Sequence, residues 1–269
     1  MPELPEVQTI IDDLRKRVIG NRITNVSFIT PSVWRNDIPG AGSLIDAEIV
    51  GLERKGKHIL LHLSNSHTLV IHLKMTGKLI ACDSKAIVPK HTHFVLKFTK
   101  QELRFNDIRR FGFLDYIPSS DLPNVGYLAN LGPDALEIRE SEFVLKLKSK
   151  KRAVKAVLLD QETISGLGNI YSDEALFAAA VRPSRIASGL SSAKLKTLHA
   201  CVINILQTAI KARGSSVSDY VDATGLPGSY QNYHKVYGRG GLPCYRCGSS
   251  IKKQIIGGRS SHYCGRCQR

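Results

Sequence analysis

The sequence predicts an α+β protein with an N-terminal helix, an antiparallel β-sandwich, a helical domain and a C-terminal hairpin. Three observations carry this prediction. Apolar residues first recur at helical spacing, then alternate with polar residues from about residue 59 to residue 116, and four of the six cysteines form two CxxC pairs near the end. The 269 residues allow one large domain or two to three small ones.

The first helix is expected from residue 4 to residue 18. Its apolar positions are Leu4, Val7, Ile10, Ile11, Leu14 and Val18. Pro5 suits the first turn of a helix, and Gly20 suits its end. The opening MPELPEV has two acids and no apolar run, so we expect no secretory signal.

Hairpins are expected next, because apolar and polar residues alternate and are interrupted by polar turns. The alternating apolar residues are Ile59, Leu61, Leu63, Leu69, Ile71, Leu73, Phe94, Leu96, Phe98, Leu103 and Phe105. This pattern indicates an antiparallel sandwich or barrel, which with the helix forms a first domain at residues 1–117. Residues 118–133 are rich in Pro, Gly, Asn and Ser and are expected to be a linker.

The apolar period then becomes helical. Its clearest stripe is Leu195, Leu198, Val202, Ile205, Leu206 and Ala209, and Gly214 suits its end. We therefore expect a helical domain at 134–222, a Gly- and Tyr-rich loop region at 223–236, and a small module at 237–269. No coiled-coil pattern is visible, so we expect a monomer.

The charge balance points to a polyanionic partner. Lysine plus arginine number 38 against 23 acids, which gives a formal charge of +15. Nucleic acid is the first partner to test, although a merely soluble basic protein has the same balance. A membrane is not expected, because the chain has no basic amphipathic helix and no run of eighteen apolar residues.

Cys244 and Cys247 are separated by sixteen intervening residues from Cys264 and Cys267. Each CxxC turn directs two thiolates at one tetrahedral ion, so this spacing predicts one Zn²⁺. Two disulfides or a redox pair are the alternative, which a reducing compartment disfavours. Four thiolates leave no open coordination position, so the zinc is expected to be structural.

The zinc hairpin is basic throughout, and no acid follows Asp222. Its charged residues are Arg246, Lys252, Lys253, Arg259, Arg266 and Arg269. This charge favours a grip on phosphates, whereas a zinc ribbon that binds protein is the alternative.

Pro2 is a candidate nucleophile, because a small second residue usually permits removal of Met1. An α-amino group titrates at about pH 8, against about 10.4 for lysine, so more of it is uncharged at neutral pH. Glu3 and Glu6 would stand beside this amine as acid/base groups. Alternatively, both acids only complement the helix dipole.

The motifs PELPEV, RKGKHILLHL, HLKMTG, RRFG, GLGNIYSDEALFAA and YGRGGLPCYRCG…GGRSSHYCGRCQR occur in this order. Together they resemble the formamidopyrimidine-DNA glycosylase family over essentially the whole chain. The resemblance implies a helix–two-turns–helix domain at 134–222, a lesion-recognition loop at 223–236 and a zinc finger at 237–269. It also implies a bacterial cytoplasmic enzyme, associated with the nucleoid through DNA.

The implied activity is that of a bifunctional glycosylase/AP lyase in base-excision repair. It would remove oxidised purines from double-stranded DNA and cleave the abasic strand by β,δ-elimination. Pro2 would be the nucleophile, Glu3 its acid/base partner and Glu6 a supporting residue. Lys57 and Arg259 would complete the catalytic site by binding the phosphates beside the lesion. Further contacts to DNA are implied for His72, Lys155, Asn169 and Tyr237.

A glycosylase must flip its target nucleotide out of the stack, and apolar wedges fill the vacated space. The resemblance assigns the wedges to Met75 and Phe111, with Arg109 or Arg110 facing the orphaned base. Ordinary core packing of Met75, and packing of Phe111 beneath a loop, are the alternatives.

Two other functions remain open. An endonuclease VIII-type enzyme would share the fold and act on oxidised pyrimidines, although PELPEV and RRFG favour the purine enzyme. A catalytically inactive DNA-binding relative would retain Met1. The contacts of the loop at 225–236 are not predicted residue by residue.

Overall fold

The computed structural model describes residues 1–36 and 38–269. The chain folds as two compact units, one of residues 1–129 with 212–229 and one of residues 130–211 with 230–269. The sequence predicts four segments that are each continuous along the chain, whereas each of these units combines two separate stretches. The four-segment division remains a prediction. Among the described residues, no helix has both the length and the apolar character needed to cross a membrane.

Helix α1 (Leu4–Val18) opens the first unit within the bounds that the periodicity predicts. Its apolar residues are fully buried, and the basic residues of its last turn complement the helix dipole. The same core contains apolar side chains from both sheets of this unit. Burial of this apolar face is what holds the helix in place.

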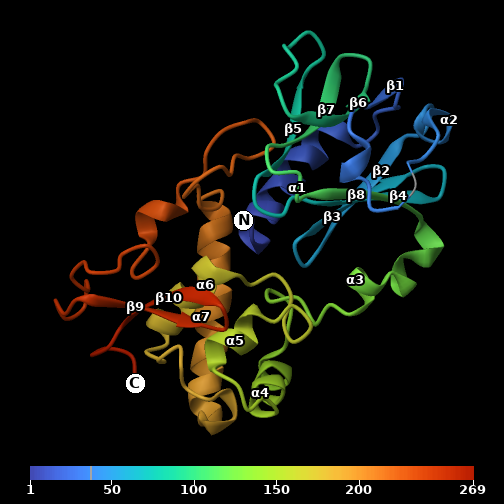
Figure 1. Ribbon diagram of the computed structural model, residues 1–269. Helices are drawn as coiled ribbons and strands as arrows, with labels where there is room; N and C mark the ends of the chain where they lie inside the picture. Colours follow the sequence, from blue (N-terminus) through green and yellow to red (C-terminus); the bar gives the residue numbers. More distant parts are fainter. Residues whose placement is uncertain (37) are drawn as a thin grey trace. The chain divides into compact units, whose positions relative to one another are not determined.

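Two antiparallel four-stranded sheets form the rest of the first unit, as the alternation predicts (Figure 1). One has the order β1-β6-β7-β5 and the other the order β2-β3-β4-β8. The strands are β1 (Asn25–Phe28), β2 (Ile49–Lys55), β3 (His58–Leu63), β4 (His67–His72), β5 (Gly77–Asp83), β6 (Thr92–Lys97), β7 (Gln101–Asp107) and β8 (Phe113–Pro118).

Short helices lie in the connections. They are η1 (Pro31–Val33), α2 (Ala41–Leu44), η2 (Ser119–Asn124) and α3 (Gly126–Ala129). The last two occupy much of the segment that the sequence marks as a linker. Residues 212–229 complete this unit, and the backbone N–H of Ala81 in β5 donates to the Ala223 carbonyl at 2.9 Å.

The second unit is helical, with a two-stranded hairpin at its end (Figure 1). Helix α7 buries the predicted stripe except for Ile205, which is only partly buried, and packs against α4 and α6. The hairpin strands pair from Ile251 to Cys264 and pack on α6. The elements are α4 (Glu140–Lys148), α5 (Val154–Leu159), α6 (Asn169–Ala178), η3 (Ala187–Gly189), α7 (Ser192–Lys211), η4 (Tyr230–Tyr233), β9 (Ile251–Ile256) and β10 (Arg259–Cys264).

Candidate functional site

Pro2, Glu3 and Glu6 come together at the N-terminus of α1. Glu3 is the N-cap residue, and its carboxylate accepts the backbone N–H of Glu6. The Glu6 carboxylate in turn accepts the backbone N–H of Glu3 at 2.8 Å. All three residues are buried, and the two acids are only 3% and 1% exposed. The reciprocal capping fixes both carboxylates beside Pro2.

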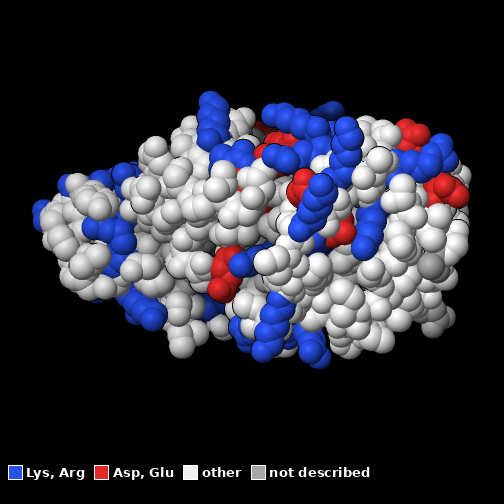
Figure 2. Space-filling view, turned by 90° about the horizontal axis from the view of Figure 1, so that it is seen from above, with Lys and Arg blue, Asp and Glu red and all other residues white. Residues whose placement is uncertain are grey.

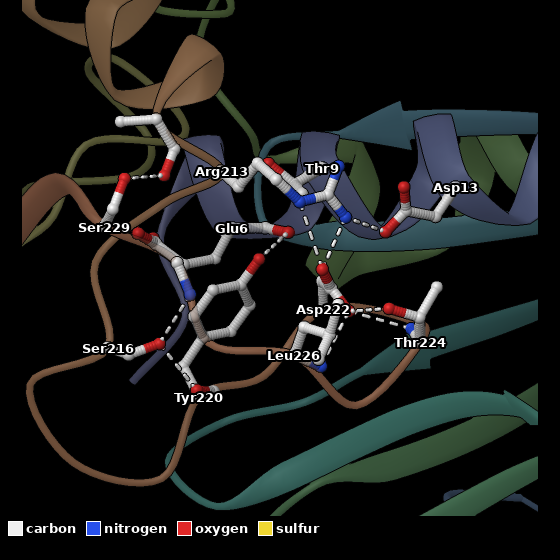
Figure 3. A network of polar contacts seen from close by, with 12 residues as sticks. Glu6, Thr9, Asp13, Arg213, Ser216, Tyr220, Asp222, Thr224, Leu226 and Ser229 are labelled. Atoms are coloured by element: carbon white, nitrogen blue, oxygen red, sulfur yellow. Dashed lines mark hydrogen bonds and ion pairs between the residues drawn. The ribbon is translucent and has the colours of Figure 1, made fainter.

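Glu6 also holds a segment that is distant in sequence. Its second carboxylate oxygen accepts the backbone N–H of Ser215 at 2.7 Å. Its backbone carbonyl accepts the Tyr220 hydroxyl at 3.4 Å (Figure 3). Gly214 has a φ of +79°, and a Cβ there would lie 2.8 Å from the Glu6 carboxylate. Only glycine therefore allows this close approach.

Lys57 lies in the turn just before β3, and His72 ends the adjacent strand β4; they are only 6% and 7% exposed. The His58 ring stands edge-on to the His72 ring, with 4.5 Å between the ring centroids. Burial lowers the pKa of His58 to about 4, although a hydrogen bond to the Lys55 carbonyl acts in the opposite direction. Burial, followed by the charges of His58 and the nearby lysines, holds the pKa of His72 well below its ordinary value. Both imidazoles are therefore neutral at neutral pH.

The tautomer of His72 follows from one contact. Its Nδ1 accepts the backbone N–H of Lys74 at 2.9 Å, so the proton of the neutral ring sits on Nε2. His72 thus offers an N–H donor that carries no positive charge. Such a donor can bind a phosphate oxygen without adding repulsion to the lysines around it.

The structure brings Met75, Arg109 and Phe111 together on two neighbouring turns. The Arg109 guanidinium donates to the Met75 sulfur at 3.6 Å and stacks 4.6 Å from the centre of the Phe111 ring. Met75 is 44% exposed and Phe111 52% exposed, so neither belongs to the core. Arg110, also exposed, has a positive φ of 53°.

Asp107 fastens these two turns and was not found by sequence reasoning. Its buried carboxylate accepts the Thr76 hydroxyl, the backbone N–H of Arg109 at 3.2 Å and that of Gly112 at 2.7 Å. A Cβ at Gly112 would lie 2.8 Å from the Phe105 ring. One carboxylate therefore sets the geometry of both turns, and nothing in its local sequence signals this.

The four predicted zinc ligands converge in the second unit. Their Sγ atoms all lie within 4.8 Å of one another, with 3.9 Å between Cys244 and Cys267 and 3.5 Å between Cys247 and Cys264. Sulfur atoms around a tetrahedral zinc lie about 3.8 Å apart, because each Zn–S bond is about 2.3 Å. The cluster therefore fits one structural Zn²⁺, which would hold the hairpin together.

Three predicted DNA contacts of the second unit lie on helix ends and turns. Asn169 is the first residue of α6, and its Oδ1 is buried with no hydrogen-bond partner among the described residues. Arg259 is exposed and directly follows the turn at Gly257 and Gly258. The backbone N–H of Tyr237 donates to the Glu174 carboxylate at 2.8 Å, which fixes the position of this tyrosine.

Lys155 differs from the expectation. Its side chain is fully buried, and its Nζ lies 2.7 Å from the Asp173 carboxylate and 2.9 Å from the Ser260 carbonyl. The other Asp173 oxygen accepts the backbone N–H of His262 at 2.8 Å. A direct contact of Lys155 with DNA is not supported by this geometry, because burial and pairing occupy the ammonium.

Known proteins share this architecture over its whole length. Models of the formamidopyrimidine-DNA glycosylase N-terminal domain and H2TH domain match residues 1–114 and 131–221, and a zinc finger found in FPG and IleRS matches residues 241–269. Formamidopyrimidine-DNA glycosylase from Desulforamulus reducens is 44% identical over 278 residues, covering 100% of this chain and 99% of the relative. This chain belongs to the formamidopyrimidine-DNA glycosylase family.

Other members of the formamidopyrimidine-DNA glycosylase family agree. The enzyme from Carboxydothermus hydrogenoformans is 40% identical, with full coverage of both chains. A Lactococcus lactis Fpg variant in complex with DNA containing Fapy-dG has a TM-score of 0.92 and 34% identity, again over both full chains. A complex of the L. lactis protein with DNA containing an abasic site has a TM-score of 0.92 and 33% identity, over 99% of each chain.

The family models leave residues 222–240 unmatched. This interval contains the whole loop region, 223–236, that the sequence predicts to recognise the lesion.

Proposed function

We propose that this chain is a bifunctional formamidopyrimidine-DNA glycosylase/AP lyase that removes oxidised purines from double-stranded DNA in base-excision repair. The observation that carries this function is the pair of buried carboxylates that cap α1 beside Pro2, in a chain that matches the family over its full length. The structural zinc takes no part in the chemistry, since its four thiolate ligands leave no open position.

The nucleophile in this proposal is the secondary amine of Pro2, freed by removal of Met1. Its nitrogen bonds to C1′ of the damaged nucleotide as the glycosidic bond breaks, and the base leaves with the bonding electron pair and a proton. Glu3 assists this departure and the opening of the deoxyribose ring, which yields an iminium.

Elimination follows from the iminium, which makes the neighbouring C2′ proton acidic. Loss of that proton expels the 3′ phosphate, and a second elimination expels the 5′ phosphate. Water then releases the sugar fragment and restores the free amine. Glu6 supports these steps by holding the backbone of Glu3.

Positive charge supplies the attraction to DNA. On the face drawn in Figure 2, Lys and Arg side chains are more widespread than Asp and Glu, in keeping with the charge of +15. We assign phosphate contacts to Lys57, His72, Asn169 and Arg259, and a further DNA contact to Tyr237. The start of α6 suits a phosphate because its first backbone N–H groups have no partner within the helix.

The turns that carry Met75 and Phe111 are proposed to enter the duplex as wedges, with Arg109 facing the orphaned base. Their exposure and their shared anchor on Asp107 support this role. Arg110 is exposed beside this cluster in sequence, and we assign it a further contact to DNA.

A Met75→Ala variant is expected to lose more base excision than cleavage of a preformed abasic site. Unstacking a damaged base costs a few kcal/mol, and the wedge offsets part of that cost, whereas an abasic site has no base to unstack. We therefore expect the loss in base excision to be about tenfold larger than the loss in abasic cleavage. Single-turnover rates on both substrates measure this. Equal losses in the two reactions would reject the wedge role.

A duplex panel tests the substrate class. DNA with 8-oxoguanine opposite cytosine should be cleaved far faster than DNA with thymine glycol opposite adenine. The reverse order would indicate an endonuclease VIII-type enzyme. Borohydride should also trap the protein on DNA, with the adduct on the peptide that begins at Pro2. A chain that binds DNA, keeps Met1 and forms no adduct would be the inactive relative.

The proposed setting is a monomer in the bacterial cytoplasm, bound to the nucleoid through DNA. The four segments expected from the sequence would then act in turn as catalytic domain, helix–two-turns–helix domain, lesion-recognition loop and zinc finger. The charge of the chain supports the association with DNA.

A further inference from the structure

A network of charged groups joins residues 212–226 to helix α1 (Figure 3). The guanidinium of Arg213 bonds to two carboxylates at once, that of Asp222 through Nε at 3.1 Å and through Nη2, and that of Asp13 through Nη2 at 2.6 Å. Asp222 is fully buried, whereas the Arg213 side chain is 45% exposed. One arginine thus ties a buried acid of the loop to an acid of the helix.

Asp222 builds the turn that follows it. Its Oδ1 accepts the backbone N–H of Thr224 at 2.8 Å, the Thr224 hydroxyl at 2.7 Å and the backbone N–H of Leu226 at 3.0 Å. Its own N–H donates to the Leu226 carbonyl at 2.8 Å. The conformation of residues 222–226 therefore depends on where this one carboxylate is held.

The backbone of Arg213 is itself held in an unfavourable conformation. Its φ is +61°, in the left-handed region that costs energy for any residue with a Cβ, and Gly214 after it has a φ of +79°. The contacts of the side chain compensate for this cost. An arginine thus occupies a place just after the end of α7 where glycine or asparagine is the usual choice.

Charge is maintained on both partners. The hydrogen bonds that Arg213 donates to Asp13 and Asp222 raise the pKa of its guanidinium above its already high ordinary value. Burial by itself would raise the pKa of Asp222, but its bonds to Arg213 and Thr224 outweigh burial and lower it. The ion pair therefore persists throughout the neutral range.

Around this network, residues buried in the core alternate with exposed stretches. Tyr220 and Ala223 are buried in the core of the first unit, whereas residues 217–219 and 225–227 are exposed. Leu226, at the tip of the second exposed stretch, is 62% exposed. The buried residues Tyr220 and Ala223 thus anchor a turn whose exposed apolar residue is Leu226.

We infer that Arg213, with its partners Asp222 and Asp13, is a positioning residue that sets the turn at 222–226 in the geometry needed to engage the everted base. This inference rests on the proposed function, in which this region recognises the lesion. An abasic site has no base for the turn to contact. The network therefore governs selectivity for base excision over cleavage of an abasic strand.

The test compares Arg213→Gln, Arg213→Lys and Asp13→Asn with a matched control. The control is Asp12→Asn, which removes the neighbouring acid of the same helix, whose exposed partner is Arg15. Single-turnover rates are measured on 8-oxoguanine opposite cytosine and on a preformed abasic site, together with thermal unfolding of each variant.

Arg213→Gln should lower base excision by about tenfold or more and leave abasic cleavage within about twofold, because misplacement of a positioning group penalises only the contact that it orients. Arg213→Lys keeps the charge but loses the planar guanidinium that binds two carboxylates at once. Its rate of base excision should lie between those of Arg213→Gln and the wild type. Asp13→Asn should show a weaker form of the same split, and Asp12→Asn should change neither rate.

Parallel losses in both reactions, or a loss that follows the drop in unfolding temperature, would overturn the inference and leave Arg213 as a stabilising residue. Unchanged excision in Arg213→Gln would overturn it as well. The proposed function is judged separately, on the wild-type protein. If the wild type cleaves abasic DNA but excises no base, the function and this inference both fall.

Discussion

A Glu3→Gln variant should bind oxidised duplex DNA with near wild-type affinity and excise the base about 10²- to 10⁴-fold more slowly, the range typical for loss of a general acid or base. Glutamine has the same shape, and its amide oxygen can still accept the backbone N–H of Glu6 that caps α1. Folding is therefore preserved, while the ability to take up and deliver a proton is lost.

Single-turnover excision and a binding titration at the same salt concentration measure this effect. Glu53→Gln is the matched control. The Glu53 side chain lies in the same unit and is 59% exposed, and its substitution removes the same charge as Glu3→Gln. Excision that stays near the wild-type rate in Glu3→Gln would remove this carboxylate from the mechanism. Equal loss in both variants would show that net charge, and not proton transfer, is responsible.

Glu6→Gln separates support from chemistry. The two Glu6 oxygens accept two backbone N–H groups, one from Glu3 and one from Ser215, whereas glutamine has a single acceptor oxygen. One of these buried donors would face an amide N–H₂ group. The physical consequence is a displaced N-cap, which is why we describe Glu6 as a supporting residue.

A Lys155→Ala variant should lose about 3–5 kcal/mol of unfolding free energy, because it leaves the buried Asp173 carboxylate without its cation. The ammonium and the carboxylate lie 2.7 Å apart, and both side chains are fully buried. Asp173 also holds the backbone of His262 in β10, so the loss should loosen the zinc hairpin. Urea denaturation with zinc present measures the change.

Lys196→Ala is the matched control, because Lys196 pairs with Glu140 at 2.9 Å on the surface, where both side chains are about half exposed. An exposed pair contributes only about 0–1 kcal/mol. If Lys155 acted by touching DNA, the Lys155→Ala variant would keep its stability and lose affinity in a salt-dependent manner. That result would restore the contact expected from the sequence.

Local sequence predicted those parts of the fold that depend on neighbouring residues. The bounds of α1 follow from its apolar spacing, and the pairing of β3 with β4 follows from alternation. The predicted zinc cluster was confirmed, because each CxxC turn brings its two thiolates together by itself. The resemblance to the glycosylase family was confirmed along the whole chain.

The burial of Lys155 was not foreseen, because a lysine in the sequence carries no sign of its environment. Its partner Asp173 lies eighteen positions away, in another helix. Likewise, Asp107 reads as an ordinary polar residue before a turn, yet its carboxylate fastens two turns. Such roles arise only when the fold brings donors to one acceptor.

The sequence by itself determined the first helix, the hairpins after residue 58, the long helix that ends near Gly214, the zinc ligands and the candidate nucleophile with its two acids, since each depends on residues a few positions apart. Only the tertiary structure decided that Arg213 meets Asp13, 200 positions away, and that Glu6 meets Ser215, 209 positions away. Segments so far apart in sequence are brought together because they bury apolar side chains in one common core. Local sequence patterns do not show which distant segments will share that core.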